Sequence, residues 1–324
     1  MRALTFDSQP GDPTQLRLAL DRATPAAPQG EVRIRTILAG ICNTDLEIVR
    51  GYAGFQGVLG HEFVGLVDQA EDPSLVGRRV VGEISASCRV CPTCRAGRYT
   101  HCPTRTTLGI RNRDGALADS FCLPVGSLHV LPDGLPDEVA VFTEPVAAAC
   151  QVLEQIQVRP TDRVIVLGDG KLGLLVAQVV ALTGCNLVAV GHHPKKLAIL
   201  AARGMATVLD GAGTQLEGNA DLVIECTGQP EGLTRARQLL RPRGTLVLKS
   251  TYHGLVQTDL SSLVVNEIRV LGSRCGPFPP AIRLLSQNLV DVLPLIEAEY
   301  PLDEAMAAFQ HAQRRGALKV LVRP

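Results

Sequence analysis

A glycine-rich loop between an apolar run and a helical segment limits this chain to a small set of folds. Residues 164–173 read Val-Ile-Val-Leu-Gly-Asp-Gly-Lys-Leu-Gly, so the apolar run passes directly into G-x-G-x-x-G. In such a loop Gly168 permits a tight turn, Gly170 lets the backbone approach a pyrophosphate, and Gly173 lets helix and strand pack closely. The helix N-terminus adds free N–H groups and partial positive charge. The loop therefore predicts a dinucleotide-binding α/β domain.

The chain that follows supports this interpretation, because apolar runs and helical segments alternate from about Asp162 onward. The expected strands are 163–167, 187–190, 207–209, 222–226, 245–249 and 269–272. The expected helices between them are 171–182, 195–203 and 230–240, and a further helical segment, 280–288, follows Gly276. Alternation at this spacing predicts a doubly wound, mainly parallel sheet.

The first part of the chain has a different texture. Short alternating apolar runs at 32–37, 63–67 and 79–84 are separated by Gly, Pro, Asn and Asp, which predicts a β-rich domain. A final apolar run at 317–322 could return to that domain as an added strand. We therefore expect a β-rich domain of 1–146 with 276–324, and a nucleotide domain of 147–275.

Composition excludes several classes of function. The 324 residues include 32 basic and 32 acidic side chains, and this balance argues against a nucleic-acid or anionic-membrane partner. No apolar run approaches the ~20 residues of a membrane span. The start, MRALTFDSQPGD, lacks the apolar region of a signal peptide. We expect a soluble cytoplasmic protein that acts on a small molecule.

Four of the ten cysteines form a cluster with the spacing C-x2-C-x2-C-x7-C within residues 88–102. Four thiolates close a tetrahedral zinc shell at ~2.3 Å and leave no open position, so Cys88, Cys91, Cys94 and Cys102 predict a structural zinc lobe. The alternatives are four unpaired surface thiols or an iron–sulfur cluster.

A second set of metal-binding side chains comes from two loops. GICNTDLE at 40–47 supplies Cys42, and GHEFVG at 60–65 supplies His61 and Glu62. Thiolate, imidazole and carboxylate are all zinc ligands, and three protein ligands leave a fourth position for water or substrate. Alone, each residue has a plain structural alternative, since a single Cys is often a small buried hydrophobe.

The order of these motifs resembles a known family. GICNTD, GHEFVG, the four-cysteine lobe, Glu144-Pro145-Val146 and GDGKLG follow the order found in zinc-dependent medium-chain alcohol dehydrogenases. The branch containing threonine, sorbitol and glucose dehydrogenases is most similar. The resemblance implies a GroES-like catalytic domain beside a Rossmann nucleotide domain, and a catalytic zinc on Cys42 and His61. Its third ligand would be either Glu62 or Glu144.

The resemblance also implies roles for three residues after the zinc thiolate. Thr44 would accept the proton of the substrate hydroxyl, and Asp45 would orient His61. Glu47 stands where many relatives carry a relay histidine, so the outward proton path would depend on a carboxylate. An ordinary Ser/Thr or Asx turn is the structural alternative for Thr44 and Asp45.

Candidate cofactor contacts lie at the ends of the predicted strands, where open α/β sheets bind ligands. They are Gly168, Gly170, Lys171, Leu172 and Gly173 in the first loop, and Cys226, Thr227, Lys249, Ser250 and Arg274 after the later strands. Plain strand-end turns are the alternative for the later group.

The end of the second predicted strand bears on which dinucleotide is used. Gly191 occupies the place where an acid usually binds the ribose 2′-hydroxyl, and His192, His193, Lys195 and Lys196 follow it. Glycine would leave room for a 2′-phosphate and the basic residues would neutralise it, which favours NADP over NAD. A solvated basic helix start, with NAD as cofactor, is the alternative.

The sequence thus predicts a zinc enzyme that transfers hydride between an alcohol, such as a secondary alcohol, polyol or sugar, and NAD(P). Two zinc ions per chain and a homodimer or homotetramer are expected. The alternatives are a zinc-stabilised nucleotide-binding sensor without activity, and a zinc-free quinone or enoyl reductase of the same superfold.

Overall fold

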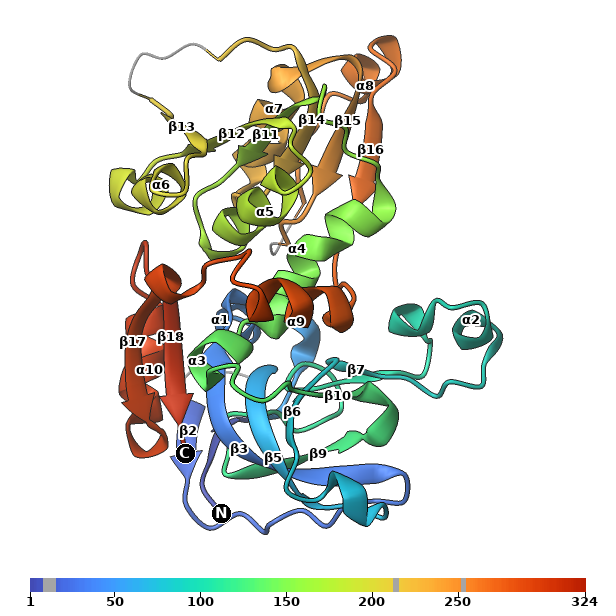
Figure 1. Cartoon of the computed structure of the whole chain (residues 1–324), viewed down its shortest axis with the longest axis vertical. Helices are drawn as coiled ribbons and strands as arrows, with labels where there is room; N and C mark the ends of the chain where they lie inside the picture. The colour runs from blue at the N-terminus through green and yellow to red at the C-terminus, as the bar shows by residue number, and fades with distance from the viewer. Residues whose placement is uncertain (8–15, 212–215, 252–254) are drawn as a thin grey trace. The chain divides into compact units, whose positions relative to one another are not determined.

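In this computed structural model, residues 1–7, 16–211, 216–251 and 255–324 are described (Figure 1). The chain divides into two compact units: unit 1 is Met1–Glu144 with Leu295–Pro324, and unit 2 is Pro145–Pro294. The sequence prediction put 276–294 with the β-rich domain, but these residues belong to unit 2. The buried Gln178 explains part of this difference, because its amide both donates to Asp291 O and accepts from Asp291 N.

Unit 1 is built mainly from short strands. Its strands are β1 (Ala3–Phe6), β2 (Leu16–Ala19), β3 (Glu31–Ile41), β4 (Gly57–Val58), β5 (Glu62–Gln69), β6 (Arg79–Gly82), β7 (Ser85–Ala86), β8 (Thr106–Thr107), β9 (Ser120–Pro124), β10 (Leu128–Val130), β17 (Ile296–Pro301) and β18 (Lys319–Arg323). Its helices are α1 (Asn43–Val49), α2 (Pro92–Arg95), α3 (Asp137–Ala140) and α10 (Ala305–Ala312), while α4 (Thr143–Gln155) begins at the end of its first segment.

The main sheet of unit 1 combines strands from its first and last segments. Among the described residues its strand order is β10-β6-β5-β3-β18-β17, with β9 also pairing β3. The last strand, β18, runs antiparallel to β3, which confirms that the final apolar run returns to the first domain. One hydrophobic core of unit 1 is formed by apolar side chains of β1, β3, α1, α10 and β18, including Phe6, Ile41, Leu46, Phe309 and Val320. This core packs α1, α10 and β18 together.

Unit 2 contains the predicted parallel sheet. Its strands are β11 (Arg163–Leu167), β12 (Asn186–Gly191), β13 (Ala206–Leu209), β14 (Ala220–Glu225), β15 (Leu240–Leu248) and β16 (Arg269–Gly272). Its other helices are α5 (Lys171–Ala181), α6 (Pro194–Ala201), α7 (Pro230–Leu239), α8 (Leu260–Val265) and α9 (Phe278–Ser286). Every ladder in the order β13-β12-β11-β14-β15-β16 is parallel, so the doubly wound prediction is confirmed.

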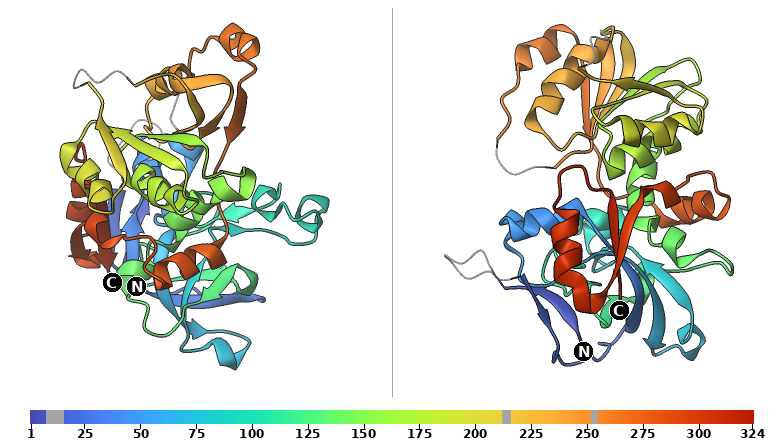
Figure 2. Two further views of the ribbon diagram at one scale, coloured as in Figure 1. Left: turned by 45° about the horizontal axis from the view of Figure 1, so that its top comes forward. Right: turned by 90° about the vertical axis from the view of Figure 1, so that its left-hand side faces the viewer.

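Different helices cover the two faces of this sheet (Figure 2). On one face, Ile165, Leu167 and Val190 pack with Ala236 and Leu239 of α7. Because alternate side chains point to opposite faces, the intervening residues of β11 are left for α5. The strand order reverses between β11 and β14, so the carboxyl ends of these strands flank a topological switch point.

No helix within the described ranges is both long and apolar enough to cross a lipid bilayer.

Candidate active site and metal centres

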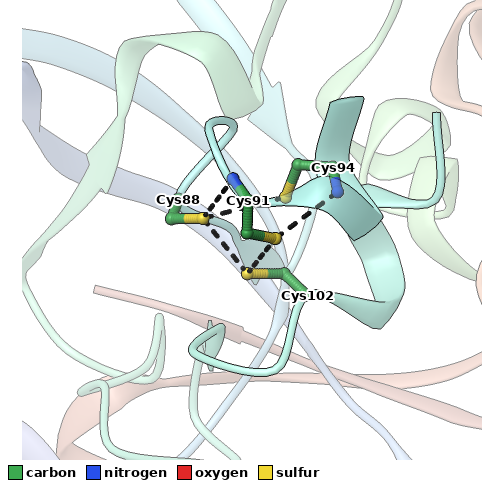
Figure 3. A group of neighbouring side chains, drawn as sticks. All are labelled: Cys88, Cys91, Cys94 and Cys102. Carbon is green, nitrogen blue, oxygen red and sulfur yellow. Dashed lines mark hydrogen bonds between the residues drawn. The ribbon is translucent and has the colours of Figure 1, made fainter. Parts of the chain in front are cut away.

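The four cysteines of the predicted lobe converge on one point. Figure 3 shows their sulfur atoms turned toward one another, and the segment carrying α2 extends away from the rest of unit 1 in Figures 1 and 2. The Sγ atom of Cys102 lies 3.6 Å from Cys88 Sγ and 3.9 Å from Cys91 Sγ. Cys88 Sγ and Cys94 Sγ are 4.0 Å apart.

These separations fit a tetrahedral zinc ion. Four ligands at ~2.3 Å from one ion lie about 3.8 Å from each other. Hydrogen bonds favour the thiolate at two of these cysteines: the Thr104 hydroxyl is the main cause that lowers the pKa of Cys102 to about 6, whereas burial raises the pKa of Cys94 to about 11. Backbone N–H groups of Val90 and Cys91 lower the pKa of Cys88. The donor set and its geometry therefore suit a closed metal site.

The second predicted group also comes together. Cys42, His61 and Glu62 offer a sulfur, a nitrogen and an oxygen that all lie within 4.8 Å of one another. His61 and Glu62 are buried, and Cys42 is partly buried. Cys42 is the N-cap of α1, whereas His61 and Glu62 stand where the chain enters β5. A soft thiolate, an imidazole and a carboxylate suit zinc, so these residues fit the metal that the motifs imply.

Asp45 ties the two loops of this group together. Its Oδ2 accepts from Cys42 N at 2.8 Å and its Oδ1 accepts from Gly60 N at 3.2 Å. His61 Nδ1 lies 3.3 Å from Asp45 Oδ1, close enough for an ion pair but not aligned for a hydrogen bond. The other ring nitrogen remains available to a metal. Burial lowers the pKa of His61, but the charges of Asp45 and Cys42 outweigh it and raise that pKa well above its usual value.

Lys319 is a site residue that the sequence analysis missed. This lysine of β18 is 2% exposed, and its Nζ donates to Glu62 Oε2. Burial alone would lower the pKa of Lys319, but Glu62 and Cys42, with a further contribution from Glu144, raise it. A buried ammonium group therefore neutralises part of the negative charge of the candidate metal ligands. The sequence feature that could have indicated this residue is a lysine at the start of an apolar strand.

The other predicted catalytic residues lie around this group. Thr44 Oγ1 is 3.7 Å from Cys42 Sγ. Glu47 pairs with Arg50 at 2.6 Å, so its carboxylate already has a cation. Glu144 lies in the first turn of α4 and acts electrostatically on Lys319, but the group of donors within 4.8 Å contains Glu62 and not Glu144.

In unit 2, the three glycines of the first loop differ in what a side chain at each position would meet. Gly168 has φ 118°, and a Cβ there would lie 2.6 Å from Cys226 O. A Cβ on Gly173 would lie 2.0 Å from Gly168 O, so helix and loop pack too closely for any side chain. A Cβ on Gly170, the N-cap of α5, would meet no protein atom within 4 Å. The space beside this helix N-terminus is therefore open to a ligand.

The later strand ends are held by internal hydrogen bonds. Thr227 Oγ1 donates to the buried Glu225 at 2.5 Å, and Ser250 Oγ accepts from Gly228 N at 2.8 Å. Lys249 Nζ donates to Ala148 O, Ser273 Oγ and Arg274 O at 2.7, 3.2 and 3.0 Å.

The predicted contacts therefore differ in exposure. Lys249 is buried and its ammonium group donates hydrogen bonds within the protein, whereas the Arg274 side chain is exposed. Burial raises the pKa of Cys226 to about 12, so this thiol stays protonated. Lys171 and Leu172, in the first turn of α5, are both partly buried.

The space next to the Cα atom of Gly191, where we expected room for a 2′-phosphate, is filled by a neighbouring side chain. The side chain of Asp169, in the loop before α5, already occupies that space: a Cβ on Gly191 would lie 2.4 Å from Asp169 Oδ2. His192 is exposed, while His193 and Lys196 are partly buried at the start of α6.

Comparison with known proteins agrees with this architecture. Residues 28–133 match the family model of the alcohol dehydrogenase GroES-like domain, and residues 172–288 match that of the zinc-binding dehydrogenases. The sorbitol dehydrogenase of Halalkalibacterium halodurans is 29% identical over 94% of both chains. The erythritol/L-threitol dehydrogenase of Mycolicibacterium smegmatis is 29% identical over 87% of both.

Solved structures share the whole fold. A protein of Escherichia coli CFT073 described as the short chain alcohol dehydrogenase RspB, complexed with NADH, has a TM-score of 0.90 at 26% identity, covering 100% of this chain and 99% of that one. A protein of Sinorhizobium meliloti 1021 described as a zinc-binding dehydrogenase, bound to NADP, has a TM-score of 0.89 at 27% identity and the same coverage. The motif order, both matching domains and these relatives agree: the chain belongs to the zinc-dependent medium-chain alcohol dehydrogenase family and is an alcohol oxidoreductase.

Proposed function

We propose that this enzyme oxidises a hydroxyl of a polyol or related alcohol with NAD(P), using one catalytic and one structural zinc per chain. The observation that carries this proposal is the convergence of Cys42, His61 and Glu62 within 4.8 Å. The polyol class is supported by relatives named for sorbitol and for erythritol and threitol.

In the proposed reaction the alcohol carbon gives a hydride to the nicotinamide and the hydroxyl gives up its proton. Zinc, when bound, would stabilise negative charge on the substrate oxygen and lower the pKa of the hydroxyl. Cys42, His61 and Glu62 would hold that ion, and Asp45 would keep His61 in orientation. Thr44, beside the Cys42 sulfur, would accept the hydroxyl proton and pass it toward solvent.

Lys319 is proposed as a positioning residue. Its contact with Glu62 Oε2 engages one carboxylate oxygen and leaves Oε1 for a metal. Glu144, whose charge also acts on Lys319, is the rival third ligand. Glu62→Gln and Glu144→Gln separate the two, because loss of the true ligand lowers the zinc content of the catalytic site.

The choice between NADP and NAD has support on both sides. Four basic residues after Gly191 favour NADP, whereas the carboxylate of Asp169 over Gly191 opposes a second negative group there.

We also propose that the enzyme is cytoplasmic. All ten cysteines are free of disulfides, which supports this location.

A homodimer through unit 2 is also proposed. The helix α8 and the edge strand β16 expose apolar side chains that a second copy could cover: Leu260, Val264, Val265 and Val270.

The test is a panel of polyols, secondary alcohols and primary alcohols with each dinucleotide, combined with total metal analysis. We expect turnover on at least one vicinal polyol and two zinc ions per chain. Cofactor binding without turnover on any alcohol would favour a sensor, and a zinc-free active enzyme would favour a quinone or enoyl reductase.

A further inference from the structure

The carboxylate of Asp169 lies where the second strand of a nucleotide domain usually ends in an acid. Asp169 belongs to the loop between β11 and α5, yet its side chain crosses to the neighbouring strand β12 and covers Gly191. A Cβ on Gly191 would lie 2.4 Å from both Cβ and Oδ2 of Asp169. Glycine at the end of β12 is therefore required by the aspartate above it, and the acid at this position comes from the loop that follows β11.

His193 holds the Asp169 carboxylate in place through its backbone and its ring. His193 N donates to Asp169 Oδ2 at 2.6 Å, and His193 Nδ1 lies 3.0 Å from Oδ1. Because an ionised carboxylate only accepts, Nδ1 carries the proton in this pair. The side chain of Asp169 is 8% exposed, against 43% for His193. The backbone of the loop is fixed as well, since Gly168 packs against Cys226 O.

The place of this group determines what it can recognise. Dinucleotide folds position the adenosine ribose at the carboxyl end of the second strand, where an acid accepts a hydrogen bond from the 2′-hydroxyl. An ionised carboxylate has about four acceptor sites, so the two bonds from His193 leave capacity for a hydroxyl donor. A 2′-phosphate has no proton to offer in its ionised form and would bring like charge against a fixed anion.

The basic residues nearby do not reverse this balance. The imidazole of His193 is already engaged by Asp169, and His192 and Lys195 are exposed to solvent, which screens their charges. Lys196 is partly buried but still reaches solvent, so its charge is screened in part as well. We infer that Asp169 is the residue that reads the ribose 2′ position and makes NAD the preferred dinucleotide. This inference rests on the proposed function only in taking a nicotinamide dinucleotide as the ligand of unit 2.

Equilibrium binding of NADH and NADPH tests the inference independently of turnover. The chain contains no tryptophan, so the fluorescence of the reduced nicotinamide reports binding without energy transfer from indole. Calorimetry with ADP-ribose and 2′-phospho-ADP-ribose gives the same comparison. We expect the unmodified enzyme to bind NADH at least about tenfold more tightly than NADPH, as expected for one added like-charge contact.

Three variants locate the preference. Asp169→Asn keeps the shape and removes the charge, and should reduce the preference for NADH about tenfold. The exchange Asp169→Gly with Gly191→Asp returns the acid to the strand end and should restore the preference. Glu154→Gln, an exposed charge change on α4, is the control and should leave the ratio unchanged.

The inference is overturned if the unmodified enzyme prefers NADPH, or if Asp169→Asn leaves the ratio of the two dissociation constants unchanged. A ratio that moves in His193→Ala but not in Asp169→Asn would also overturn it, because the histidine would then be the reading group. Should Asp169→Asn fail to fold, the exchange variant still tests the claim. Preferential NADH binding without turnover of any alcohol would contradict the proposed function and support the role of Asp169.

Discussion

The candidate zinc site contains charged side chains that are buried in the protein interior. Glu62 and Lys319 are both buried, and each satisfies the other although they are 257 residues apart in sequence. An unpaired buried charge is costly, whereas a paired one is tolerated. The lysine therefore makes the buried carboxylate possible in the absence of a metal, and its role depends on that carboxylate.

Lys319→Met should lower the free energy of unfolding by about 3–5 kcal/mol when zinc is removed by a chelator, because Glu62 is left charged and unpaired. Zinc should recover part of the loss, since the ion supplies the missing positive charge. Urea unfolding with and without zinc measures both effects. In the double variant with Glu62→Gln the loss should shrink markedly, and an equal loss in both backgrounds would refute the coupling.

Thr44 offers a second test at the level of one side chain. Thr44→Val keeps the shape but removes the hydroxyl, and should lower kcat by about 10²–10⁴-fold if this group takes the substrate proton. Thr44→Ser retains the hydroxyl and should keep most of the activity. The measurement is steady-state kinetics on the best alcohol, together with zinc content. If Val and Ser variants are equally active, the proton acceptor lies elsewhere.

At the scale of elements, the cysteine lobe depends on a metal more than on packing. It has little apolar burial of its own, and Arg89 adopts φ 59° between Cys88 and Cys91 to bring the sulfurs together. Such segments draw folding free energy from their ion.

Cys94→Ala should therefore remove one zinc per chain and make the segment 88–102 sensitive to proteolysis, because three ligands no longer close the site. The Tm should fall, while hydride transfer per folded molecule should change little. Limited proteolysis, metal analysis and calorimetry measure these outcomes. Wild-type melting with an undiminished zinc content would contradict the structural assignment.

The elements of unit 2 were predictable because their signals are local. Hydrophobic periodicity and the glycine loop located β11 (Arg163–Leu167) to the residue, and the lobe followed from cysteine spacing. Lys319 and Asp169 could not be assigned in this way. The partner of Lys319 lies on a distant strand, and Asp169 looked like a spacer within G-x-G-x-x-G until the fold brought β12 beside it. Both depend on tertiary contacts that no local pattern reports.

For the whole molecule, the exposed apolar surface of α8 and β16 predicts association of two copies. Val265 is 79% exposed and Val264 is 75% exposed, and β16 forms the edge of the sheet. Val265→Lys should shift the enzyme toward monomer, since a desolvated lysine opposes the contact. Light scattering after size exclusion measures the mass. Leu182→Lys, elsewhere on unit 2, is the control, and an unchanged mass in Val265→Lys would exclude this surface.

In the proposed mechanism, Cys42 and its neighbours hold the zinc at which an alcohol is oxidised. The most direct measurement is zinc per chain together with hydride transfer in the unmodified enzyme, in Cys42→Ser and in the control Cys122→Ser. We predict two zinc ions and turnover for the unmodified enzyme and the control. Cys42→Ser should keep the lobe zinc and bind NADH normally, but lose the other zinc and hydride transfer. Turnover within tenfold of the unmodified enzyme in Cys42→Ser would contradict this role of Cys42.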